Sequence, residues 1–126
     1  MSLDAFVAGA DTPLARLERV FDWHRDWFAS DTFCGCMFAH AAAEFADKGC
    51  SIHEISVQQK AGLTQFIERI LAGIVPAARA GILAPMMVML LDGATLAVQI
   101  SSRANAAADA WRAARALLAA PSEAFA

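Results

Sequence analysis

Residues 13–29 read PLARLERVFDWHRDWFA, and this stretch decides the fold class because its large side chains repeat with a helical period. One face of it carries such a side chain every three or four residues: Leu14, Leu17, Phe21, His24 and Phe28. This spacing is typical of the buried face of an α-helix. Thr12 can cap free backbone N–H groups, and Pro13 fits the first helical turn. The sequence therefore predicts a helix over about residues 13–29.

Four further helices are predicted, over about residues 36–46, 52–74, 85–102 and 106–119. Pro76 should follow the end of one helix, Pro85 should open the next in its first turn, and Asn105 can cap the last. No stretch alternates β-branched and polar residues with a period of two, so no sheet is expected. We expect residues 1–126 to form a single all-α domain, a bundle of about five helices.

The composition argues against two classes of protein. Ten basic and 13 acidic residues give a net charge of -3, and no basic run could follow a phosphate backbone, so we expect no direct contact with nucleic acid. The longest unbroken apolar stretch, residues 80–91, is too short to span a bilayer. Three cysteines are an odd number, and a chain with this much core does not depend on disulfides. Reduced thiols and a cytoplasmic location are therefore expected.

The last two predicted helices carry strips of small side chains that favour close helix packing. Gly93, Ala97 and Ser101 follow one another at intervals of four, and a glycine in a helix interior costs about 1 kcal/mol relative to alanine, which close packing would compensate. Two such helices from each of two copies would form a four-helix bundle around a two-fold axis, hence a homodimer. The residues predicted at this interface are Leu90, Gly93, Ala97, Ser101, Ala107, Trp111, Ala114 and Leu118. The alternative is that both helices only complete the core of one chain.

Three segments in series resemble the effector domains of TetR-family transcriptional repressors. Residues 33–45 read FCGCMFAHAAAEF and are similar to the family's F-x-G-C-x-F-x-x-A-x-x-E segment. Residues 13–27 look like the helix that precedes that segment. Residues 90–94 read LLDGA, as in the helix that family members use to dimerise. The resemblance covers about residues 12–119 in order and spacing.

The resemblance implies a C-terminal domain that binds a small-molecule effector and dimerises, while a separate N-terminal helix-turn-helix domain holds operator DNA. That N-terminal domain is missing from this sequence, so DNA binding is expected of the parent protein only. In the family, the effector favours one spacing of the two DNA-binding heads over another. No cofactor, metal or enzymatic activity is implied.

The expected effector pocket collects aromatic, aliphatic and sulfur-containing side chains from four helical segments, a lining suited to a small, mostly apolar ligand. The predicted lining residues are His24, Trp27, Phe28, Phe33, Cys36, Phe38, Phe66, Ile70, Met86 and Met89. For any one of them, a place in the ordinary core is the alternative.

Two other functional classes stay open from sequence alone. Cys36, His40 and Glu44 lie four residues apart, and a Cys/His pair one helical turn apart can hold zinc, which would make the protein a metal-sensing variant. Successive steps of four residues drift around the helix, however, so the outer pair diverges. A stand-alone helical enzyme or interaction module is the other alternative, although no known catalytic motif is present.

Overall fold

The structure is a computed structural model, and it describes residues 1–30, 33 and 51–125. These residues form five α-helices and no β-strand, which confirms the all-α prediction for the described part of the chain. The helices are α1 (Leu3–Ala8), α2 (Pro13–Phe28), α4 (Ser51–Leu71), α5 (Ala77–Ser101) and α6 (Ala106–Ala119), followed by a 3-10 turn at Ser122–Phe125. The helix predicted over residues 36–46 lies outside the described residues.

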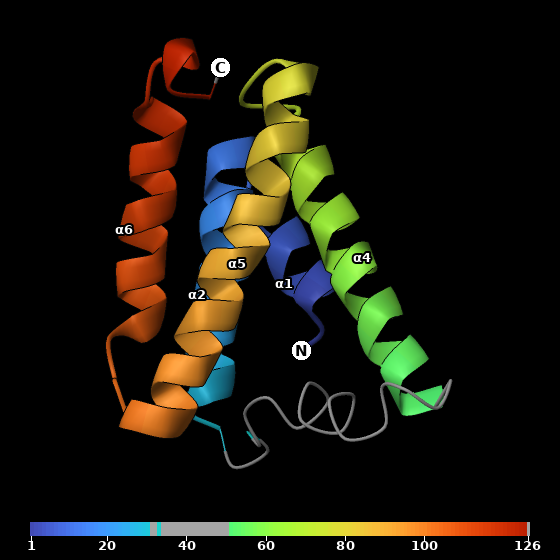
Figure 1. The fold of residues 1–126 in the computed structure, drawn as a ribbon, viewed down its shortest axis with the longest axis vertical. Coiled ribbons are helices and arrows are strands. Elements are labelled where there is room, and N and C mark those ends of the chain that lie inside the picture. Colours follow the sequence, from blue (N-terminus) through green and yellow to red (C-terminus); the bar gives the residue numbers. More distant parts are fainter. Residues whose placement is uncertain (31–32, 34–50, 126) are drawn as a thin grey trace.

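The centre of the fold is the pair α2 and α5 (Figure 1). Helix α4 packs on both of them from one side and α6 packs on both from the other, while α1 lies against α2. The core contains the fully buried Phe21, Leu71 and Met87, one from each of α2, α4 and α5. From α6 the core receives alanines, since Ala106, Ala107, Ala110 and Ala114 are all buried. Small side chains therefore let α6 approach its neighbours closely.

Helix α2 begins as the sequence predicts. The Thr12 hydroxyl accepts a hydrogen bond from the Ala15 N–H at 3.1 Å, and Pro13 occupies the first turn. The predicted apolar face is buried at Leu17, Phe21 and His24, whereas Leu14 remains 41% exposed.

Helix α1 is absent from the sequence-based prediction. It has six residues, of which only Val7 is buried, so it shows too little periodicity to be recognised. Its local signal is the Ser2 hydroxyl, which caps the Ala5 N–H at 3.3 Å. Tertiary contacts hold it in place, because Arg19 of α2 donates to the Phe6 carbonyl at 2.8 Å and stacks over the Phe6 ring.

The predicted start of the next-to-last helix at Pro85 is wrong. Helix α5 begins at Ala77 and continues through Pro85. The ring of Pro85 removes the N–H that would pair with the Gly81 carbonyl. Both residues are exposed, so water can satisfy that carbonyl and the helix tolerates the proline. Residues 77–84, predicted to be a connection, therefore bury Ala80, Leu83 and Ala84 in the core.

Two other helix ends differ in detail. Helix α4 ends at Leu71 rather than near residue 74, in a tight turn in which the Gly73 N–H bonds to the Ile70 carbonyl. Asn105 precedes α6 as predicted, but its side chain makes no capping hydrogen bond. The other end of α6 is held by Arg79 of α5, whose Nη2 donates to the Leu117 and Leu118 carbonyls at 3.1 Å and also to that of Ala120.

Helix α5 is longer than its unbroken apolar stretch suggests. It is the one helix in residues 1–30 and 51–125 that is long and apolar enough to cross a membrane by length and composition, with a mean hydropathy of 1.8 in its most apolar window. Of that window, 39% is buried, and α5 is in contact with α2, α4 and α6.

Candidate functional site

A cluster of aromatic rings surrounds His24 near the carboxyl end of α2. The imidazole ring lies 5.1 Å from the ring of Trp23, 6.1 Å from Trp27 and 6.2 Å from Phe28, each measured between centroids. Phe33 adds a ring 4.9 Å from Trp27 and 5.3 Å from Phe28. Four predicted effector residues, His24, Trp27, Phe28 and Phe33, are thus brought together. Trp23 belongs to the cluster as well and was not predicted.

His24 is the polar centre of this cluster. Its side chain is buried, and Nδ1 lies 2.7 Å from the Val20 carbonyl oxygen. Because a carbonyl only accepts, Nδ1 carries the hydrogen of this bond. Burial lowers the pKa of His24 below 6.5; the Val20 hydrogen bond opposes this shift, Lys60 adds to it and Asp92 opposes it. The ring is therefore neutral at physiological pH, and its Nε2 offers one hydrogen-bond acceptor among aromatic faces.

An ion pair joins the two helices that face this end of α2. Lys60 of α4 is bonded to the Asp92 carboxylate of α5, and both side chains are about half exposed. Both charges act on the pKa of His24, Lys60 lowering it and Asp92 raising it. The pairing of Lys60 with Asp92 was not predicted from sequence, because the two residues lie 32 positions apart in the chain.

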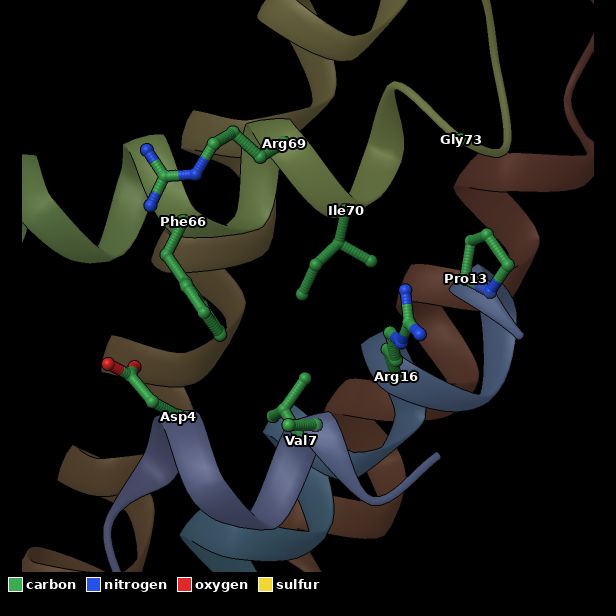
Figure 2. A pocket seen from close by; sticks show the side chains of 9 residues that line it. Asp4, Val7, Pro13, Arg16, Phe66, Arg69, Ile70 and Gly73 are labelled. Atoms are coloured by element: carbon green, nitrogen blue, oxygen red, sulfur yellow. The ribbon is translucent and has the colours of Figure 1, made fainter. Parts of the chain in front are cut away.

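The other predicted effector residues are not part of this cluster. Phe66 and Ile70 line a groove between α1, α2 and α4 (Figure 2). Met86 packs against the core, whereas Met89 is 65% exposed on the surface of α5 and so lines no interior cavity. Cys36 and Phe38 lie outside the described residues.

The predicted dimer residues differ in burial between α6 and α5. On α6, Ala107 and Ala114 are buried within the chain, and the Trp111 ring lies 5.3 Å from that of Phe21. Ala107 and Ala114 are therefore taken up by the chain's own core, while Trp111 and Leu118 are only partly buried against it. On α5, Gly93 and Ser101 are exposed, and Leu90 and Ala97 are half-buried.

The exposed side of α5 forms a continuous apolar stripe, which we call the outer face of α5. Its exposed large residues are Ile82, Met89, Leu96 and Ile100, with exposed fractions between 39 and 74%. Gly93 lies between Met89 and Leu96, and a Cβ atom added there would meet nothing within 4 Å. The spacing of three, four or seven residues places these positions along one side of the helix.

Possible metal ligands are sparse in the described part of the chain. No group of three or more His, Cys, Asp or Glu side chains there could hold a metal ion. Cys36, His40 and Glu44, the zinc alternative, lie outside the described residues.

Comparisons of the chain with protein-family models, with curated proteins and with solved structures found no match.

Proposed function

We propose that this chain is the ligand-sensing and dimerisation module of a transcriptional repressor similar to the TetR family, and that it binds a small, mostly apolar effector in the cytoplasm. The observation that carries the proposal is the position of His24, a neutral imidazole with one acceptor nitrogen among four aromatic rings. Apolar walls with one oriented polar group are the usual design of a small-molecule site.

The same geometry narrows the class of effector. Aromatic rings favour flat apolar molecules, and the acceptor at Nε2 of His24 favours a ligand that donates one hydrogen bond, such as a phenol or an indole. A ligand without that donor would cover Nε2 and leave it unpaired, so it would bind more weakly.

A pair of matched ligands tests this effector class. We expect a substituted phenol to bind at least about tenfold more tightly than its methyl ether, because only the phenol donates to Nε2. His24→Phe keeps an apolar ring but removes the acceptor, so it should abolish the difference. Isothermal titration calorimetry measures both ligands, with Arg112→Gln as the surface control. Equal affinity of the two ligands for the wild-type chain would contradict the proposal.

Dimerisation is supported by the outer face of α5. One 25-residue helix is about 37 Å long, so its outer face buries only about 700 Å² in total between two copies, below the roughly 1,200 Å² of a stable interface. The partly buried Trp111 and Leu118 of α6 therefore join the interface, in keeping with a bundle of four helices.

Substitutions on the outer face test the homodimer. We expect the wild-type chain to sediment as a dimer at micromolar concentration and Ile100→Asp to sediment as a monomer with unchanged helix content. Leu14→Asp is the matched control, because Leu14 is an exposed leucine on α2 rather than α5. A wild-type monomer, or an Ile100→Asp dimer of unchanged affinity, would refute this arrangement.

A further inference from the structure

The groove between α1, α2 and α4 is a second concave site, separate from the His24 cluster. Its volume is about 390 Å³, within the usual range for small-molecule sites. Phe66 and Ile70 point from α4 toward Val7 of α1 and form an apolar floor (Figure 2).

Close backbone packing shapes one end of the groove. Gly73, in the turn that follows α4, lies against Pro13, and a Cβ atom at Gly73 would come within 2.9 Å of the Pro13 ring. Because neither Pro13 nor the backbone around it can move far, a side chain at residue 73 would push α2 away from α4 and alter the groove.

The charges in the groove are unevenly placed. Arg16 stands beside Pro13 and Ile70 at one end. Asp4 lies below Phe66 at the other end, where Arg69 also lines the groove (Figure 2). The Nε of Arg16 donates to the Ala10 carbonyl at 3.1 Å, so the guanidinium is held by the protein itself. Among the ion pairs of the described residues, none involves Arg16, and its two Nη groups have no carboxylate partner there.

We propose that this groove binds a monocarboxylate with a short apolar body. The two Nη groups of Arg16 match the fork of a carboxylate, and Val7, Phe66 and Ile70 cover the apolar part. Asp4 and Arg69 line the far end and carry opposite charges, so the end at Arg16 is the one with an excess of positive charge. The carboxylate comes either from an aliphatic acid or from an aryl acid, and the size of the groove accommodates both.

Titration calorimetry with octanoate, phenylacetate and octanol tests the proposal. We expect octanoate or phenylacetate to bind with micromolar to millimolar affinity. The acid that binds more tightly identifies the ligand class, aliphatic or aryl. Octanol should bind at least tenfold more weakly than octanoate. Arg16→Gln should lower carboxylate affinity at least tenfold but leave octanol unchanged, which shows that the groove is intact. Arg112→Gln, a distant exposed arginine, should have no effect.

A second variant covers the case in which loss of the Arg16–Ala10 bond disturbs the fold. Ala8 is exposed and lines the groove, so Ala8→Trp should fill it and block carboxylates without touching Arg16. His24→Phe should leave carboxylate binding unchanged, which separates this site from the effector site proposed above. The proposal is overturned if neither acid binds, or if both bind equally well to the wild type, Arg16→Gln and Ala8→Trp.

Discussion

The two faces of α5 are equally apolar and have opposite environments. Leu83, Met87 and Leu91 on the inner face are at most 1% exposed, whereas Met89 and Ile100 on the outer face are 65 and 74% exposed. Helix α2 differs, because the face opposite its apolar face carries charged residues. The comparison teaches that hydropathy marks a buried face only when the opposite face is polar. In α5 the contacts with α2, α4 and α6 alone define the inside.

The largest expected effect comes from truncating the inner face. Leu91→Ala leaves a cavity in a packed core and should lower the free energy of unfolding by about 2–5 kcal/mol. Met89→Ala, two residues away on the outer face, should change it by less than about 0.5 kcal/mol. Urea unfolding at low protein concentration, where association contributes little, measures both. Similar losses for the two variants would remove the distinction between the faces.

The edge of α5 that faces α6 should give the next largest effect. Arg79→Met keeps the length of the side chain but leaves the carbonyls at the end of α6 without their donor, so unfolding should become easier by about 1.5–3 kcal/mol. Arg112→Met is the control, because the Arg112 side chain is 80% exposed. Equal midpoints for the two variants in thermal unfolding would show that the Arg79 hydrogen bonds to the end of α6 contribute nothing to stability.

A pH effect is expected from His24, whose pKa is influenced by Asp92 of α5. The pKa of His24 is lower in the folded than in the unfolded chain, so the unfolded chain takes up the proton first as the pH falls. The contribution to stability is complete above about pH 6.5, is lost as the pH falls from there to the folded pKa, and then levels off. His24→Gln should abolish this part of the pH dependence in urea titrations from pH 8 to pH 5. Identical profiles for variant and wild type would rule it out.

The smallest effect is expected at the end of α5. Ser102 adopts a left-handed conformation with φ of 50°, which glycine adopts without steric cost. Ser102→Gly should therefore stabilise the chain by about 0.5–1 kcal/mol, seen as a higher midpoint of thermal unfolding. Ser101→Gly, inside the helix, should instead destabilise it by a similar amount. The reverse order would mean that Ser102 is not left-handed in solution.

Local features of the fold were predictable from sequence, and contacts between distant segments were not. The start of α2 followed from Thr12 and Pro13, and the spacing of His24, Trp27 and Phe28 placed them in one cluster. The path of α5 through Pro85 could not be predicted, because exposure of Pro85 and Gly81 depends on the packing of the whole helix. The groove was missed for a similar reason, since α1 forms one wall and its position depends on tertiary hydrogen bonds.

The attachment of α1 to α2 has a mechanical consequence. Three side chains of α2 hold three carbonyls of the N-terminal segment: Trp23 that of Met1, Arg19 that of Phe6 and Arg16 that of Ala10. The two segments are therefore joined by hydrogen bonds at three points along α2. The Trp23 ring also contacts His24, so a displacement of the Met1 backbone would be transmitted to the aromatic cluster through Trp23.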